Sequence, residues 1–302
     1  MNKLKLARFL LSLLRVLPKR YPLRSSVQPP FFILSAGRSG STLLNRMLNE
    51  HPQLGLPSEQ YFMGPAIFKY HFYNFMLWRD LMQVIVGELW DTRKHTWDLE
   101  VGRTIQSIMA WTGQERSLDR VMDHLFREVV SKDIWGDSTP LNVVYYKELY
   151  QLFPQARYIF LMRDGRDVVA SYKAGGEQAF GALASIKAAS ERWVLAMDAL
   201  HGLKRRTSVL EIRYEELVSN PQLNLDRICS HLGVPALKGW ESYTQHVPET
   251  AFYQPSHHHA IREMPFDESI GKWRQVLTEE EQAYSEQVMR RHLERYGYLS
   301  PR

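Results

Sequence analysis

The sequence predicts an α/β fold with a central parallel sheet, helices on both of its faces and a helical, aromatic-rich insertion. Two segments, 31–54 and 157–172, begin with a continuous apolar run, pass through a polar turn and continue with apolar residues at helical spacing. A third segment, 209–218, starts like a strand and leads to a helical pattern over 221–232. Continuous apolar runs are typical of strands buried on both faces of a parallel sheet. We therefore expect the turns that follow these strands to meet at one edge of the sheet.

The first of these units ends in a loop of small residues. Phe-Phe-Ile-Leu over 31–34 is followed by a turn that contains Gly37 and Gly40. Ser41 and Thr42 stand where helix N-caps are expected, before apolar residues spaced for one helix face. In a strand, loop and helix of this kind the loop N–H groups and the positive end of the helix converge. The loop is predicted to bind a phosphate or sulfate group, with an ordinary βα turn as the alternative.

This loop differs from the ATP-binding P-loop. The pattern G-x-x-x-x-G-K-[ST] requires a lysine after its second glycine, where this chain has Ser41. The cation is instead Arg38, two residues before Gly40. The arrangement indicates a phosphate chemistry other than that of ATP.

The insertion is expected within residues 61–130, which read as largely helical. Its first part is dense in aromatic residues: Tyr61, Phe62, Phe68, Tyr70, Phe72, Tyr73, Phe75 and Trp78. Most of these rings are expected in a core or an interface, and a few in a pocket for an acceptor molecule.

Length and composition predict one folded domain over residues 26–302. With 302 residues, 44% of them hydrophobic, the chain can bury a substantial core. Cys229 is the only cysteine, so no disulfide within the chain is possible, and its helical spacing from Leu225 and Leu232 places it in the core. A lone thiol fits a reducing compartment, and we expect a cytoplasmic protein.

Residues 1–25 are predicted to form a basic amphipathic helix. Residues 1–24 hold seven Lys and Arg residues and no acid, so the net charge of +5 leaves −2 for the rest. Because the body of the chain is not basic, nucleic acid is not an expected partner. The helix either lies on an anionic membrane surface, which would make the protein peripheral at a membrane, or docks on its own domain. Its longest uncharged run, Phe9 to Leu14, is far below the ~20 residues that span a bilayer.

Three motifs, in this order, resemble the sulfotransferase family, which uses 3′-phosphoadenosine 5′-phosphosulfate as its sulfonate donor. The loop Arg-Ser-Gly-Ser-Thr at 38–42 resembles the family's 5′-phosphosulfate loop. The stretch Arg163 to Ser171 resembles its 3′-phosphate motif, and "ESIGKWR" at 268–274 is similar to its C-terminal cofactor loop. The pattern is closest to the tyrosylprotein and related bacterial-type sulfotransferases. The resemblance implies a P-loop-like three-layer fold.

The resemblance also implies a set of donor-binding residues: Arg38, Ser39, Gly40, Ser41, Thr42, Arg163, Ser171, Tyr214, Gly271, Lys272 and Trp273. Arg163 and Ser171 would read the 3′-phosphate, which ATP lacks. The alternative for Arg163 is an ion pair with Asp164 or Asp167. Trp273 would stack on the adenine, or else is a core residue flanked by solvated cations.

Sulfuryl transfer, by analogy with phosphoryl transfer, depends on positioning and charge stabilisation. Arg38 would stabilise the leaving phosphate oxygen. A base must also take the proton of the acceptor. The resemblance to the tyrosylprotein branch implies that Glu59, in "HPQLGLPSEQYF", is this catalytic base, with Asp137 and His51 as competitors.

One segment departs from the family pattern. "WGDSTP" has Asp137 and Ser138 where similar segments often read Glu-Lys, so Arg38 or another cation must replace that lysine, or activity is low. No metal is expected, because no Walker-type Ser or Thr follows a lysine and no carboxylate is evident to hold Mg²⁺. The residues His257 to His259 lack the carboxylate or cysteine spacing that would complete a metal site.

The leading hypothesis is a sulfotransferase that moves a sulfonate group from 3′-phosphoadenosine 5′-phosphosulfate to a hydroxyl, or as a second choice an amine, of a small molecule, glycan, peptide or lipid. A P-loop kinase-like phosphotransferase is the rival among enzymes. A catalytically inactive nucleotide-binding scaffold is the rival from another class, supported by Ser138.

Overall fold

The computed structural model describes residues 3–13, 19–91, 97, 99–244 and 269–300. The chain divides into two compact units. Unit 1 comprises Met1–Pro30 and Gly55–Ala156, and unit 2 comprises Phe31–Leu54 and Arg157–Arg302. The triple histidine at 257–259 lies outside the described residues, and the predicted domain boundary between residues 25 and 26 stays a prediction.

Unit 2 holds the predicted strand–turn–helix units. Its strands are β1 (Phe31–Leu34), β4 (Arg157–Met162) and β5 (Val209–Arg213). Its α-helices are α2 (Ser41–Asn49), α8 (Gly165–Phe180), α9 (Ile186–Lys204), α10 (Tyr214–Ser219), α11 (Pro221–Leu232), α12 (Trp273–Val276) and α13 (Glu279–Arg295). Two short 3₁₀ turns, η4 (Gly181–Ala184) and η5 (Trp240–Thr244), complete the described part.

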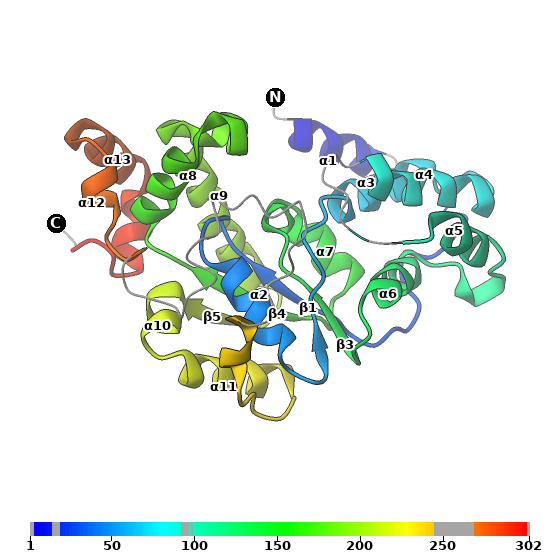
Figure 1. Cartoon of the computed structure of the whole chain (residues 1–302). Coiled ribbons are helices and arrows are strands. Elements are labelled where there is room, and N and C mark those ends of the chain that lie inside the picture. The colour runs from blue at the N-terminus through cyan, green and yellow to red at the C-terminus, as the bar shows by residue number, and fades with distance from the viewer. Residues whose placement is uncertain (1–2, 14–18, 92–96, 98, 245–268, 301–302) are drawn as a thin grey trace. The chain divides into compact units, whose positions relative to one another are not determined.

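The three strands of unit 2 are parallel and adjacent in the order β1-β4-β5, within a sheet of five strands among the described residues. Phe32 is in register with Tyr158, and Leu161 with Ile212. Helices α8, α9, α12 and α13 lie on one side of these strands, and α10 and α11 lie on the other (Figure 1). Because both faces are covered, every residue of β1 is at most 1% exposed. The predicted α/β class with a parallel sheet is confirmed.

The burial of Cys229 and the N-cap of α2 were both predicted from the sequence, and one of the two predictions is confirmed. Cys229 is 1% exposed, as its helical spacing indicated. The predicted side-chain N-cap of α2 is wrong, because the N-cap residue is Gly40 and no side chain caps the helix. Ser41 is already inside the helix. The physical reason is backbone conformation: the cap position has a φ of 92°, which favours glycine over any residue with a Cβ.

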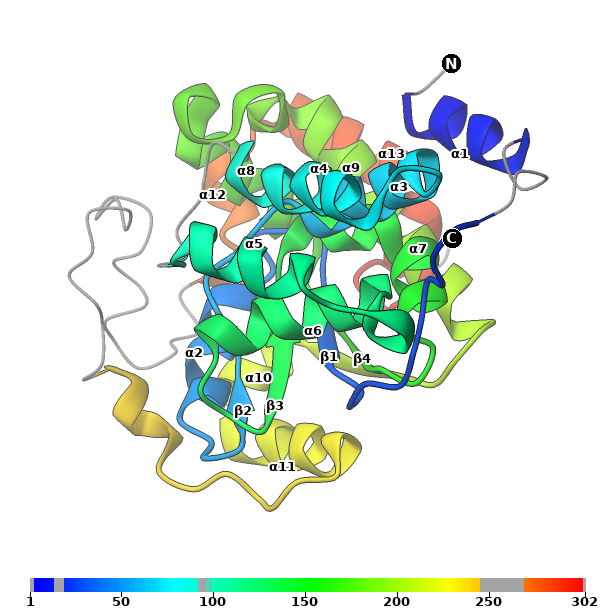
Figure 2. The same ribbon diagram turned by 90° about the vertical axis from the view of Figure 1, so that its right-hand side faces the viewer.

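Unit 1 contains the largely helical insertion. Its described elements are α1 (Lys3–Leu13), α3 (Met63–Tyr73), α4 (Trp78–Asp91), α5 (Val101–Met109), η2 (Gly113–Glu115), α6 (Leu118–Val129), β3 (Ile134–Asp137), η3 (Pro140–Tyr145) and α7 (Tyr146–Leu152). The two-residue strand β2 (Leu54–Gly55) lies at the junction of the two units. Helix α4 lies alongside α3 (Figure 2).

The aromatic residues of the insertion are partly core and partly surface. Phe62 and Trp78 are at most 2% exposed, and Phe62 packs edge-on against Trp97 with ring centroids 5.7 Å apart. In contrast, 42% of Tyr73 and 66% of Phe75 are exposed. Most of the eight rings are thus buried or half-buried, and the exposed ones lie at the C-terminal end of α3 and in the turn that follows it.

The basic N-terminal helix docks on its own unit. The Arg8 guanidinium donates hydrogen bonds of 2.7 and 2.8 Å to the two carboxylate oxygens of Glu148 in α7, and one of 3.0 Å to the carbonyl of Val144. The carboxylate raises the pKa of the Arg8 guanidinium, against the effect of burial. No helix among the described residues is long and apolar enough to cross a bilayer.

We expect Arg8→Ala to lower the free energy of unfolding by about 1–3 kcal/mol, because it leaves the buried Glu148 carboxylate without its charged donor. Urea unfolding measures this change. Lys5→Ala is the matched control, since it removes a cation from an exposed position of the same helix. Equal effects of the two substitutions would show that the Arg8 pair adds nothing to stability.

Candidate functional site

The loop between β1 and α2 has an unusual backbone. Gly37, Arg38 and Gly40 have φ values of 81°, 53° and 92°, and Arg38 is the only non-glycine residue with positive φ in the described part of the chain. The hydroxyl of Ser35 accepts a 3.2 Å hydrogen bond from the Gly37 N–H, and the hydroxyl of Ser39 donates one of 3.2 Å to the Gly37 carbonyl. Turns of this conformation direct backbone N–H groups inward and form concave anion sites. The strand, loop and helix that the sequence predicted are present, and binding of a phosphate or sulfate group stays a prediction.

The Arg38 side chain extends to α8. Its Nε donates a 3.0 Å hydrogen bond to the Ser171 hydroxyl, and its guanidinium lies 5.0 Å from the centroid of the Phe180 ring. Phe180 reaches this place because α8 breaks at Gly176, where φ is 73°. Its ring then packs edge-on against Tyr172, whose hydroxyl donates to the carbonyl of Ala36 in the β1–α2 loop. The loop and the first turns of α8 are therefore held together by side chains from both.

Arg163 follows β4 directly and is 8% exposed. Its Nη1 donates a 3.0 Å hydrogen bond to the Arg38 carbonyl, and its Nη2 donates one of 2.6 Å to the Ser269 carbonyl. Its Nε is buried and has no hydrogen-bond partner among the described residues. The sequence left open an ion pair of Arg163 with Asp164 or Asp167, but the described contacts of Arg163 are carbonyl oxygens and one aromatic ring.

That ring belongs to Tyr214, the first residue of α10, which lies 4.5 Å from the Arg163 guanidinium. The Tyr214 hydroxyl and the Ser269 hydroxyl are 2.6 Å apart. A Cβ added to Gly40 would lie 2.4 Å from Cδ2 of the same ring. The expectation that Arg38, Arg163 and Tyr214 meet at one sheet edge is confirmed.

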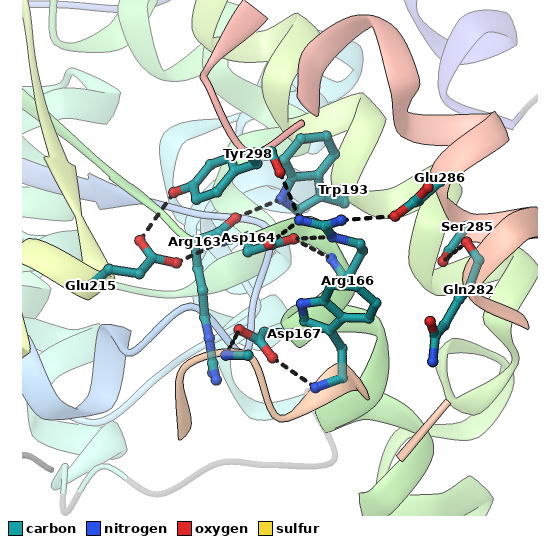
Figure 3. A network of polar contacts seen from close by, with 12 residues as sticks. Arg163, Asp164, Arg166, Asp167, Trp193, Glu215, Gln282, Ser285, Glu286 and Tyr298 are labelled. Carbon is teal, nitrogen blue, oxygen red and sulfur yellow. Dashed lines mark hydrogen bonds and ion pairs between the residues drawn. The ribbon is translucent and has the colours of Figure 1, made fainter. Parts of the chain in front are cut away.

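The turn after Arg163 contains buried charges that satisfy one another (Figure 3). Arg166 donates to the Asp164 carboxylate at 2.8 Å, to Glu286 of α13 at 2.7 Å and to the Tyr298 carbonyl at 2.7 Å. Glu215 accepts from the Asp164 N–H at 2.9 Å and from the Tyr298 hydroxyl at 3.0 Å. Burial raises the pKa of the Glu215 carboxyl. Buried charges are tolerated only with such partners, so the turn depends on residues from the end of the chain.

Asp167 joins the turn to the predicted C-terminal cofactor loop. It is 2% exposed, and its two carboxylate oxygens accept hydrogen bonds of 2.8 Å from the Gly271 N–H and 3.0 Å from the Trp273 N–H. Burial raises the pKa of the Asp167 carboxyl, while these two N–H groups and the Arg163 charge act in the opposite direction. The sequence offered Asp167 only as an alternative ion-pair partner of Arg163, although it stands inside the Arg163 to Ser171 stretch.

The indole of Trp273 is 7% exposed and packs against two cations. The guanidinium groups of Arg166 and Arg274 lie 4.1 and 4.4 Å from its ring centroid. This packing agrees with the alternative of a core tryptophan flanked by cations, and stacking on an adenine stays a prediction. Lys272 is exposed.

Two of the three candidate bases differ sharply in their surroundings. In unit 1, Glu59 is half-buried and accepts a 2.8 Å hydrogen bond from the Tyr61 hydroxyl. In unit 2, His51 is 1% exposed, and its Nδ1 lies 3.0 Å from the Gln53 nitrogen. Because Nδ1 must accept from that N–H, Nε2 carries the proton and donates to the Pro235 carbonyl at 3.0 Å. Both nitrogens of His51 are thus committed to structural bonds.

Asp137, the third candidate, is also committed. It accepts hydrogen bonds of 2.8 and 2.6 Å from the backbone and hydroxyl of Thr139, and one of 2.7 Å from the Asn142 amide. Burial raises the pKa of its carboxyl. Ser138 beside it is 2% exposed. These contacts give the segment that departs from the family pattern a structural role at the start of η3.

Among the described residues, one group has the composition of a metal site: Asp198, His201 and His292. His292 Nε2 lies 3.1 Å from an Asp198 carboxylate oxygen, and His201 Nε2 lies 3.1 Å from the Tyr296 hydroxyl. Burial lowers the pKa of both imidazoles, and the cation of Arg295 acts in the same direction. A nearby cation disfavours a metal ion, and the group links α9 to α13 and the residue after it through hydrogen bonds.

The fold and the loop geometry define the class of this protein. Parallel strands, a glycine-containing turn with positive φ values after β1 and a buried arginine after β4 are the features of a P-loop-like α/β fold. The model of the sulfotransferase family matches residues 29–238, and the chain belongs to this family.

Relatives and solved structures agree with that membership. The chain is 24% identical over 225 residues to a protein-tyrosine sulfotransferase of Drosophila melanogaster and 27% identical over 227 residues to protein-tyrosine sulfotransferase A of Caenorhabditis elegans. The matches cover 73% and 72% of this chain but only 40% and 52% of those relatives.

Among solved structures, the sulfotransferase domain of the Synechococcus PCC 7002 olefin synthase has a TM-score of 0.63 at 23% identity, covering 94% of this chain and all of that one. A mouse sulfotransferase complexed with PAP has a TM-score of 0.51 at 13% identity, covering 89% and 86%. These likenesses show the fold.

We expect Gly40→Ala to lower the free energy of unfolding by more than Gly233→Ala does. Both glycines have positive φ, at 92° and 73°, which costs a residue with a Cβ about 1–2 kcal/mol. Only at Gly40 would the new Cβ also meet a ring, that of Tyr214, which adds about 1–3 kcal/mol of overpacking. Urea unfolding compares the two. Equal losses would mean that the Tyr214 ring moves aside without cost.

Proposed function

We propose that this protein transfers a sulfonate group from 3′-phosphoadenosine 5′-phosphosulfate to a hydroxyl, or as a second choice an amine, of an acceptor. The observation that carries the proposal is the direct connection of two cationic motifs in unit 2. Arg163 binds the backbone of Arg38 at 3.0 Å, and the Arg38 side chain binds Ser171 at 3.0 Å. Two anion-binding motifs that touch suit a donor with two separate phosphate groups.

The second motif argues against ATP as the donor. ATP has no 3′-phosphate, and a Walker lysine is missing from the loop at Ser41. Each Nη of Arg163 carries two N–H groups and donates one hydrogen bond to a carbonyl oxygen, which leaves donors for a further acceptor. The mouse relative of the fold, which was complexed with PAP, supports the same donor class. No step of this proposal needs a metal.

The transfer can be written with residues of this chain. The acceptor oxygen attacks the sulfur, the bond from sulfur to the 5′-phosphate oxygen breaks, and adenosine 3′,5′-bisphosphate leaves. Arg38 balances the negative charge that develops on the leaving oxygen. Glu59, which is half-buried, takes the proton of the acceptor, whereas Asp137 and His51 are at most 4% exposed.

The acceptor class is proposed from the names of two relatives and from the chemistry of the transfer. The two relatives from fly and worm are named protein-tyrosine sulfotransferases, so a phenolic hydroxyl on a peptide is the first acceptor to try, followed by small-molecule, glycan and lipid hydroxyls. Contact of residues 1–24 with a membrane surface, and a cytoplasmic location peripheral to a membrane, are further proposals. The exposed Phe9 on α1 supports the membrane contact.

Binding of adenosine 3′,5′-bisphosphate should be clearly tighter than binding of AMP, because only the first carries the phosphate that Arg163 is proposed to read. Arg163→Ala should remove most of the difference, about 1.5–3 kcal/mol for a lost hydrogen bond to a charged group. Calorimetry measures the affinity of the protein and of the variant for both ligands. Arg205→Ala, which removes an exposed cation of unit 2, should change neither affinity. Equal affinities of the unmodified protein for the two ligands would refute the proposed donor.

Glu59→Gln keeps the side-chain size but removes the proton acceptor. Turnover should fall roughly 10²- to 10⁴-fold, which is the usual contribution of a positioned base. Affinity for adenosine 3′,5′-bisphosphate should stay within about twofold, because that ligand has no sulfonate. Glu100→Gln, at an exposed position of the same unit, is the control. Normal turnover of Glu59→Gln would transfer the role of base to another residue, and a parallel loss of thermal stability would indicate a structural carboxylate.

A further inference from the structure

The segment from Ser269 to Trp273 is held by hydrogen bonds to three side chains of the proposed donor site and its neighbourhood, those of Arg163, Tyr214 and Asp167. Arg163 and Tyr214 hold Ser269, through its carbonyl at 2.6 Å and its hydroxyl at 2.6 Å. Asp167 holds the other end, through the N–H groups of Gly271 at 2.8 Å and Trp273 at 3.0 Å. A short segment held at both ends has little freedom, so the Ser269 carbonyl can fix one Nη of Arg163 in place.

Asp167 and the neighbouring Asp164 have different kinds of partner. The Asp164 carboxylate forms an ion pair with Arg166 at 2.8 Å. Asp167 is 2% exposed, and within the described part of the chain its carboxylate accepts hydrogen bonds from backbone N–H groups. A buried carboxylate satisfied by backbone donors fixes the path of that backbone more firmly than a flexible side-chain partner would.

The electrostatic effect of Asp167 alone is unfavourable for the proposed ligand. Asp167 and Arg163 both bind the Ser269 to Trp273 segment, and burial raises the pKa of the Asp167 carboxyl while the Arg163 charge lowers it. A fixed negative charge close to a phosphate site repels the phosphate and weakens binding. Asp167 is therefore expected to favour donor binding in another way, and its hydrogen bonds to the Gly271 and Trp273 N–H groups indicate that it holds the backbone of the segment.

We propose that Asp167 is a positioning residue for donor binding: it fixes the Ser269 to Trp273 segment so that Ser269 orients Arg163 and Tyr214. The inference rests on the proposed function. It gives Asp167 no contact with the donor and no part in the chemical step.

The two possible roles of Asp167 change the affinity for adenosine 3′,5′-bisphosphate in opposite directions. If Asp167 were only a charge near the site, Asp167→Asn would tighten the binding of adenosine 3′,5′-bisphosphate. If it positions the segment, Asp167→Asn weakens binding, because the amide keeps one acceptor oxygen and turns an NH₂ group toward the other N–H. We expect a loss of about 10- to 100-fold, in line with the loss of a hydrogen bond to a charged group. In turnover the loss appears in KM for the donor, while kcat stays within about threefold.

The experiment combines calorimetry with hydrogen exchange over residues 269–276 of the full chain. Asp167→Asn should speed exchange of the Gly271 and Trp273 amides with or without ligand, and weaken binding of adenosine 3′,5′-bisphosphate. Asp226→Asn, an exposed Asp to Asn change in α11 of the same unit, is the matched control and should alter neither.

Three results would overturn the inference. The first is tighter or unchanged binding in Asp167→Asn. The second is unchanged exchange in that variant. The third is fast exchange of both amides in the unmodified protein, which decides the matter even if the variant does not fold. A failure of the unmodified protein to prefer adenosine 3′,5′-bisphosphate over AMP is a separate result, because it overturns the proposed function and the donor role of Asp167 together.

Discussion

One buried guanidinium, that of Arg163, connects most of the site. A buried cation is costly unless its N–H groups are satisfied, and here two of them donate to the carbonyls of Arg38 and Ser269 while the Tyr214 ring covers one face. Neutral carbonyls reduce the desolvation cost without neutralising the charge. The cation is therefore held in place and still attractive to an anion, which is the electrostatic preorganisation that binding and catalysis both use.

The same burial explains why the end of the chain contributes to a site formed by the early motifs. The turn after Arg163 has charges that need partners, and Glu286 and the Tyr298 carbonyl supply them to Arg166. Both lie beyond residue 238, where the match to the family model ends. Helix α13 is therefore more than a cover for the sheet, because its carboxylate compensates a charge in the turn that positions Arg163.

The sequence predicted the parts of the fold that depend on short-range patterns. The apolar runs of β1, β4 and β5 identified buried parallel strands, and strand direction alone brought Arg38, Arg163 and Tyr214 to one edge. Contacts that depend on backbone conformation were not predictable in this way. The N-cap glycine of α2, the break of α8 at Gly176 and the hydrogen bonds of Asp167 follow from φ values and from segments about 100 residues apart.

Arg38 contacts the second motif twice, and this double contact fixes the spacing of the two cationic motifs. Its carbonyl accepts from Arg163, and its side chain donates to Ser171. The residue reaches both partners with a φ of 53°, a strained conformation for a residue with a Cβ, which persists only where the surrounding contacts enforce it. Since backbone and side chain of one residue bind two points of the other motif, the loop after β1 and the turn after β4 cannot shift independently. In the proposed donor site, this fixed spacing suits a nucleotide with two separate phosphate groups, whereas one with a single phosphate group would leave one of the two cationic motifs without its anion.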